Sequence, residues 1–202
     1  MDTVEMRSKP SQDALDMAHL IRERRTIRKF ELRPVSNHLV TELLRVSIQS
    51  IALDQQYDSY RFLFISSQKA KEKVASAIMK AYLDQRMKWL PNKLNQALVE
   101  RTARIPAFLI AIQKGMGKAE DRERDYAAIC AMLQSFSLLG WQDGLGMVWN
   151  TESYIHEKAF SDAIKLQEDE RVICIMYIGY FKKIPRAKQR TPAIEKLTLL
   201  QE

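Results

Sequence analysis

One helical stretch constrains the fold of this chain more than any other part of its sequence. Residues 124–142 read RDYAAICAMLQSFSLLGWQ, and apolar side chains occur on nearly every side of the helix that they would form. A helix of this kind is buried all round, either inside a large core or against another subunit. The chain has 202 residues, so we expect this helix to form a subunit interface.

The other elements follow from the spacing of apolar residues. Stretches rich in branched and aromatic residues predict strands at 60–66, 105–112, 147–150 and 172–180. Helical periodicity predicts further helices at about 14–25, 39–48, 68–89 and 93–103. Ser11 or Asp13 could cap the first helix and Ser36 the second, and the segment GMGKAEDRE at 115–123 is expected to be a turn. Strands and helices do not alternate regularly, which favours an α+β fold.

The ends of the chain and its composition limit the class of protein. We expect one domain over residues 1–202, with an N-terminal arm at 1–12 and a C-terminal arm from about 191. No apolar run is long enough to span a bilayer, and the N-terminal residues do not have the pattern of a secretory signal. We therefore expect a cytoplasmic protein that does not associate with a membrane.

Common catalytic motifs are missing from the sequence. It has no strand-linked GxGxxG, no P-loop and no GxSxG elbow. The three histidines lack metal-ligand spacing, and Cys130 and Cys174 lie in apolar contexts typical of small core residues. If the protein is an enzyme, we expect a cofactor rather than a metal or a catalytic side chain to perform the chemistry.

Two basic clusters lie near opposite ends of a chain whose net charge is +7. The first is Arg24-Arg25-Thr26-Ile27-Arg28, and the second is Lys188-Gln189-Arg190. Either could be solvated charge. However, the first consists mostly of arginine, whose planar fork matches phosphate oxygens better than a lysine does. Arg24, Lys188 and Arg190, with a hydroxyl hydrogen bond from Thr26, could together hold a phosphomonoester.

Three blocks of the sequence resemble the nitroreductase family of flavoproteins. RRTIRKF followed by RPVS, within 24–36, is similar to the family's Arg-x-Ser-x-Arg/Lys pattern with a nearby Phe and Pro-Val. DYAAICAMLQSFSLLGWQDGLGMVW at 125–149 is similar to its long interface helix that runs into Gly-Leu-Gly. IGYFKKIPRAKQRTP at 178–192 is similar to its final strand with a Lys-x-Arg pair. The blocks occur in the family's order, and the similarity covers about 15–195.

The resemblance implies an intertwined homodimer with an antiparallel central sheet of about four to five strands flanked by helices, and with FMN at the interface. In that arrangement Arg24, Lys188 and Arg190 would face the phosphate. Arg25 and Thr26 would bind the phosphate or the ribityl chain, and Arg28 would approach the pyrimidine edge of the flavin. The remaining residues implied to bind the cofactor are Gln85, near the pyrimidine, and Trp149, Asn150, Thr151 and Glu152, whose backbone N–H groups would meet the flavin near N5.

The sequence departs from the family in the segment before the first predicted strand. Relatives carry Pro-Ser-x-x-Asn-x-Gln-Pro-Trp there, and this chain has IALDQQYDSYRF. Gln56 falls where the Asn would be and could donate its amide to a flavin carbonyl, whereas Asp58 cannot donate when ionised.

The function that the resemblance implies is an FMN-dependent oxidoreductase. Hydride would pass from NADH or NADPH to flavin N5, and then to a nitroaromatic, a quinone or a similar conjugated acceptor in a ping-pong scheme. One alternative is a flavin-binding family member without reductase activity, acting as a sensor or carrier. Another is a basic module that binds nucleic acid, but this leaves the interface-like helix and the Lys188/Arg190 pair unexplained. We therefore expect the partners to be a second copy of the chain and a small electron acceptor, and not nucleic acid.

Overall fold

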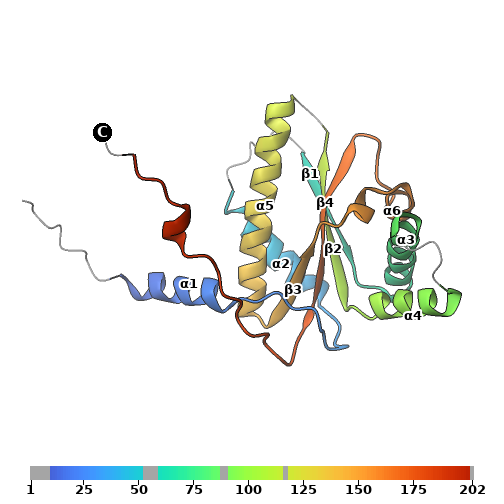
Figure 1. Ribbon diagram of the computed structural model, residues 1–202, viewed down its shortest axis with the longest axis horizontal. Coiled ribbons are helices and arrows are strands. Elements are labelled where there is room, and N and C mark those ends of the chain that lie inside the picture. The colour runs from blue at the N-terminus through green and yellow to red at the C-terminus, as the bar shows by residue number, and fades with distance from the viewer. Residues whose placement is uncertain (1–9, 52–58, 87–90, 116–117, 201–202) are drawn as a thin grey trace, which may run out of the picture.

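The computed structural model describes residues 10–51, 59–86, 91–115 and 118–200, and an antiparallel sheet lies at its centre (Figure 1). Within these residues the sheet has four strands, the number that the sequence predicts, and their order is β1-β2-β4-β3. The strands are β1 (Tyr60–Ile65), β2 (Ala107–Lys114), β3 (Leu145–Asn150) and β4 (Glu170–Tyr180). The central strands β2 and β4 are buried over most of their length, which explains their almost continuous apolar sequences.

Helices cover both faces of the sheet and make two separate cores. On one face α2 (Asn37–Ile48) and α5 (Ala119–Gln142) pack on the sheet. On the other face lie α3 (Gln68–Arg86) and α6 (Lys158–Ile164), with α4 (Asn92–Ala103) packed against α3. The layered arrangement, with the sheet between the two groups of helices, is seen in Figure 1. It agrees with the predicted α+β class.

Two predicted caps occur where the sequence places them. The hydroxyl of Ser11 accepts the N–H of Ala14 at 3.3 Å and caps α1 (Gln12–Glu23). The hydroxyl of Ser36 likewise accepts the N–H of Leu39 at 3.5 Å at the start of α2. These bonds satisfy N–H groups that a first helical turn leaves without a partner.

The beginning of α5 corrects one prediction. The predicted turn at 115–123 is too long, because the helix starts at Ala119. Glu120 and Asp121 lie in the first turn, where negative charge is favourable beside the helix N-terminus. The carboxylate of Asp121 also accepts the backbone N–H of Lys118 at 3.3 Å. The charged residues that suggested a loop are therefore those of a helix start.

The burial of α5 within one chain is one-sided. Ile129, Met132, Leu133 and Phe136 are completely buried against the sheet and α2. On the other side Tyr126, Ala127, Ala131 and Gln134 are exposed. The expected burial all round is therefore not reached in the single chain, and the apolar part of the open side is available to a second subunit.

The segment between β3 and β4 contains helices that the sequence analysis missed. They are the 3₁₀ turn η1 (Ser153–His156) and α6. Tyr154 and Phe160 from these turns are buried in the second core. Such helices span about one or two turns, so an apolar period is not visible in their sequence. Among the described residues, no helix combines the length and apolar character that crossing a membrane would require.

The first helix and the C-terminal segment extend away from the sheet on the side of α5 (Figure 1). Helix α1 contributes no buried residue. Residues 182–200 are exposed throughout, including the 3₁₀ turn η2 (Ala193–Lys196). Exposed apolar side chains occur on both segments: Leu15, Met17, Ile21, Ile194, Leu197, Leu199 and Leu200.

Candidate functional site

The first basic cluster is held against the edge of the sheet. Thr26 forms a parallel bridge with Met147 of β3, and the N–H of Ile27 donates to the carbonyl of Met147 at 3.1 Å. A few residues later the N–H of Glu31 donates to the carbonyl of Tyr180 at 2.8 Å. The segment 26–31 therefore runs in a fixed path from β3 to the end of β4.

Two glycines allow this close approach. Gly146 of β3 and Gly179 of β4 are direct partners in the sheet. A Cβ on Gly146 would lie 2.5 Å from Cγ1 of Ile27, and one on Gly179 would lie 2.9 Å from Cδ1 of Phe30. The absence of both Cβ atoms lets Ile27 and Phe30 pack on the sheet, which leaves Arg28 between two anchored residues.

Residues of both basic clusters line one cleft, which has a volume of about 560 Å³. The side chain of Phe181 stacks on Trp141 of α5, with ring centroids 5.0 Å apart, and directs the C-terminal segment toward the first cluster. We call this space the arginine cleft. Its lining residues are Ile21, Arg22, Arg24, Arg25, Thr26, Arg28, Gln134, Pro185, Arg186, Ala187, Lys188 and Arg190. The expectation that Arg24, Lys188 and Arg190 meet in one place agrees with this geometry.

The positive charge of the arginine cleft is not compensated by carboxylates of the described residues. Its lining contains seven cationic residues and no carboxylate. Within the described part of the chain, none of these seven forms an ion pair. Burial lowers the pKa of Arg24, and the neighbouring charges of Arg190 and Arg25 lower it further. Cations that repel one another in a partly buried site favour a bound anion.

Two guanidinium nitrogens identify the kind of anion that would fit. The Nε atoms of Arg24 and Arg25 are buried and have no hydrogen-bond partner among the residues that the structure describes. Arg25 uses Nη1 to donate to the carbonyls of Arg22 and Arg24, so part of its side chain holds the end of α1. Buried N–H donors without acceptors are rare in proteins, and a phosphate offers several acceptor oxygens together with negative charge. The residues present therefore fit a phosphate group.

A second cleft of about 550 Å³ lies beyond Arg28, which lines both spaces. We call it the tyrosine cleft, because Tyr177 forms part of its wall together with Val148 and Asn150. The hydroxyls of Tyr177 and Tyr154 lie 2.7 Å apart, and Oδ1 of Asn150 accepts the N–H of Glu152 at 2.9 Å. Burial raises the pKa of both tyrosines, so both hydroxyls stay protonated at neutral pH. This wall of the cleft is uncharged and firmly hydrogen-bonded.

The other predicted residues are less closely associated with the clefts. Trp149 points to the opposite face of the sheet, where it packs against the core under α5, and so its side chain does not reach the tyrosine cleft. Thr151 and Glu152 follow Asn150 and are exposed. Gln56 lies outside the described residues. Gln85 is in the last turn of α3, and its side chain is likewise outside the description.

Three polar residues that line the arginine cleft were not predicted. Arg22 lies just before the first basic cluster in the sequence, and its exposed side chain also lines the arginine cleft. Arg186 belongs to the same basic tail as Lys188, so the cluster could have been drawn wider. Gln134 lies on α5. It is a polar residue in an otherwise apolar helix, and this could have marked it as a candidate for the site.

Comparisons with known proteins agree on one family. The family model described as "Nitroreductase family" matches residues 21–180. YfhC of Bacillus subtilis strain 168, whose name is "Putative NAD(P)H nitroreductase", is 28% identical over 179 residues, which cover 89% of this chain and 91% of that protein. A nitroreductase-like family protein from Bacillus cereus superposes with a TM-score of 0.80 at 29% identity, covering 98% of this chain and 100% of the other. The NADPH:FMN oxidoreductase of Vibrio harveyi, solved with NAD+, has a TM-score of 0.69 at 18% identity, covering 93% and 78%. This last likeness is one of fold.

Proposed function

The chain belongs to the nitroreductase family, and on that premise we propose that it is an FMN-dependent oxidoreductase. It would take hydride from NADH or NADPH and pass it to a nitroaromatic, a quinone or a similar conjugated acceptor in a ping-pong scheme. The relatives named for FMN or for NAD(P)H support this choice of cofactor and donor. The observation that carries the proposal is the arginine cleft, where two buried guanidinium donors have no partner in the described part of the chain.

The phosphate of FMN is the anion that we assign to the arginine cleft. The charge of Arg190 contributes to the lowered pKa of Arg24, and Lys188 lines the cleft two residues before Arg190. Arg25 and Thr26 complete the wall from the first cluster, where the Thr26 hydroxyl can donate to a phosphate or ribityl oxygen. A charge-assisted hydrogen bond of this kind contributes about 1.5–3 kcal/mol.

The position of Arg28 suggests where the flavin ring would lie. Because Arg28 lines both clefts, a ligand with its phosphate in the arginine cleft can extend past this side chain into the tyrosine cleft. When bound, FMN supplies the atom that accepts and releases hydride. The task of Arg28 is electrostatic, since a fixed cation stabilises the negative charge of a reduced ring. Asn150 and Tyr177 contribute a preorganised wall and no charge of their own.

We also propose that the working unit is a homodimer. The open side of α5 carries apolar side chains, as the predicted interface requires. Helix α1 and the C-terminal segment, which carry exposed apolar residues, lie on the same side of the molecule (Figure 1), and a second copy would cover them. Light scattering at micromolar concentration should give twice the chain mass of 23.5 kDa. A mass of one chain would contradict the dimer.

The visible spectrum of the purified protein tests the proposed activity. We expect a yellow protein with an oxidised-flavin spectrum that bleaches anaerobically on addition of NADH or NADPH, and regains its colour when a quinone is added. A yellow protein that neither donor bleaches would favour the alternative of a flavin-binding sensor or carrier. A colourless protein that does not take up added FMN would refute both.

A further inference from the structure

A third cleft adjoins the two already described. It has a volume of about 950 Å³ and lies between residues 26–33 and residues 182–185. It shares Thr26 and Arg28 with the arginine cleft, and Arg28 and Phe30 with the tyrosine cleft. We call it the lysine cleft, because Lys29, Lys182 and Lys183 all line it. A molecule bound there would lie directly beside the proposed flavin site.

The lysine cleft is rich in uncompensated positive charge. Arg28, Lys29, Arg33, Lys182 and Lys183 line it, against the single carboxylate of Glu31. Within the described residues, none of these five cations forms an ion pair. The space is therefore suited to an anion with more than one negative charge.

The lysine cleft also offers apolar surface and a rigid base. Leu32 and Ile184 line it from opposite segments, yet they remain 77% and 58% exposed. The guanidinium of Arg33 lies over the ring of Tyr180, 3.9 Å from its centroid, and the N–H of Glu31 is bonded to the same residue. Apolar walls with a cationic rim match a ligand that combines a flat aromatic ring with phosphate groups.

We propose that the lysine cleft binds the adenosine half of the hydride donor, and that Lys182 and Lys183 recognise its 2′-phosphate. The protein would then prefer NADPH to NADH. This inference rests on the proposed reductase function and adds the identity of the donor. NADH has a neutral hydroxyl at the position of the 2′-phosphate, so the lysine charges have a group to recognise only in NADPH. A charge-assisted contact to that phosphate corresponds to a preference of about tenfold or more.

Calorimetric titration of the flavin-loaded protein separates this contact from catalysis. The probes are adenosine 2′,5′-bisphosphate and 5′-AMP, which differ in the 2′-phosphate. We expect the unaltered protein to bind the bisphosphate about tenfold or more tightly than 5′-AMP. In the double variant Lys182→Ala/Lys183→Ala this preference should fall close to unity, and the ratio of kcat/KM for NADPH over NADH should fall with it.

A second double variant serves as the control for net charge. Lys69→Ala/Lys73→Ala removes two exposed lysines from α3, neither of which lines any of the three clefts. It should retain the full preference for the bisphosphate. Equal binding of both probes to the unaltered protein would refute the proposal, as would a preference that survives the loss of Lys182 and Lys183. A yellow protein bleached equally by both donors contradicts this inference alone, whereas one bleached by neither contradicts the reductase function.

Discussion

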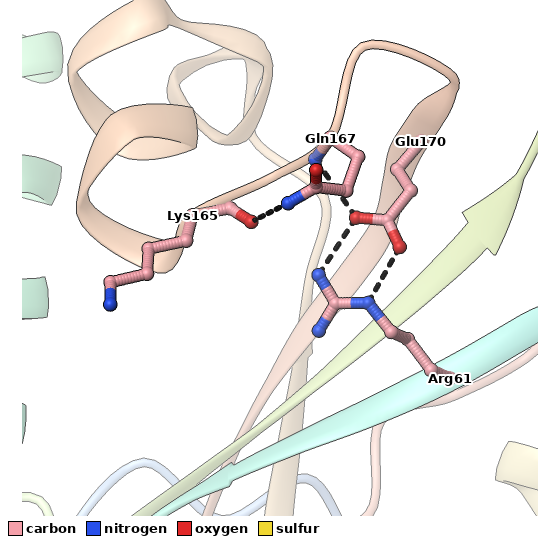
Figure 2. A network of polar contacts seen from close by, with 4 residues as sticks. All are labelled: Arg61, Lys165, Gln167 and Glu170. Atoms are coloured by element: carbon pink, nitrogen blue, oxygen red, sulfur yellow. Dashed lines mark hydrogen bonds and ion pairs between the residues drawn. The ribbon is translucent and has the colours of Figure 1, made fainter.

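The arginine side chains near the two ends of β4 differ in whether they have a carboxylate partner. Glu170 is the first residue of β4, and its carboxylate accepts hydrogen bonds from Nε and Nη2 of Arg61 at 2.6 and 2.7 Å (Figure 2). It also accepts the backbone N–H of Gln167 at 3.0 Å. Beyond the last residue of β4, Tyr180, the chain leads to the arginine cleft, where several guanidinium groups gather without a carboxylate. The first arrangement, the paired end, completes its hydrogen bonds within the chain. In the second, the open end, the Nε atoms of Arg24 and Arg25 have no hydrogen-bond partner among the described residues.

The pKa of each arginine reflects this difference. The hydrogen bond from Arg61 to Glu170 raises the pKa of Arg61 and lowers that of Glu170. Burial and two neighbouring arginines lower the pKa of Arg24. The charges of Arg61 and Glu170 at the paired end therefore stabilise the fold, whereas the charge of Arg24 at the open end is unfavourable in the folded protein. The comparison teaches that the presence of arginine says little about function until its partners are known.

The largest expected effect comes from breaking the paired end. Glu170→Ala leaves Arg61 partly buried without its carboxylate, and we expect the free energy of unfolding to fall by about 2–3 kcal/mol. Urea denaturation of the flavin-loaded protein measures the loss. FMN content should not change, because Glu170 lies at the other end of β4.

The double variant Arg61→Met/Glu170→Leu is the control for this change. It removes both charges and leaves neither unpaired, so its loss of stability should be smaller than that of Glu170→Ala. Equal losses in the two variants would show that the ion pair is not the reason for the effect.

The paired end also shows what the sequence could and could not predict. All four strands were predicted from their branched and aromatic residues, because β-structure leaves a local signal. The pairing of Arg61 with Glu170 joins residues 109 positions apart and has no such signal. It depends on the sheet order, in which β2 lies between β1 and β4.

The residues that meet at the open end were predicted more fully than the ion pair at the paired end, because clustered basic residues are visible in the sequence. Two basic clusters far apart in sequence suggested one phosphate site, and residues of both line the arginine cleft. The groove made by Gly146 and Gly179, which holds Ile27 and Phe30 in place, was not foreseen, since it appears only when β3 and β4 pair. The sequence marks Gln134 as a polar residue in an apolar helix and Arg186 as part of the basic tail, but only the packing of α5 and the C-terminal segment shows that both line the cleft.

A smaller change in stability is expected when a simple anion binds at the open end. Inorganic phosphate should stabilise the flavin-free protein by about 1 kcal/mol, which corresponds to a rise in Tm of about 2–4 °C. Chloride at the same ionic strength should give a smaller rise. The phosphate effect should disappear in Arg24→Ala and persist in Glu170→Gln. Equal stabilisation of all three proteins by phosphate would mean that the anion acts elsewhere.

The smallest effect is a pH dependence at the paired end. Because the pKa of Glu170 is lowered in the folded protein, its contribution to stability is fully present above its ordinary value of 4.5. The contribution is lost as the pH falls through the lowered pKa. The stability difference between the unaltered protein and Glu170→Gln should therefore be constant near neutral pH and shrink in acid. A difference that grows on acidification would contradict the assigned direction.

The central claim is that the open end holds a phosphate, and the preference of the flavin-free protein for FMN over riboflavin tests it most directly. These ligands differ only in the phosphate. Titration followed by flavin fluorescence should show a strong preference for FMN in the unaltered protein. In Arg24→Ala/Arg190→Ala that preference should fall by about tenfold or more, while Arg45→Ala, which removes an exposed arginine paired with Glu42, should retain it. If the double variant keeps the full preference for FMN, the arginine cleft is not the phosphate site.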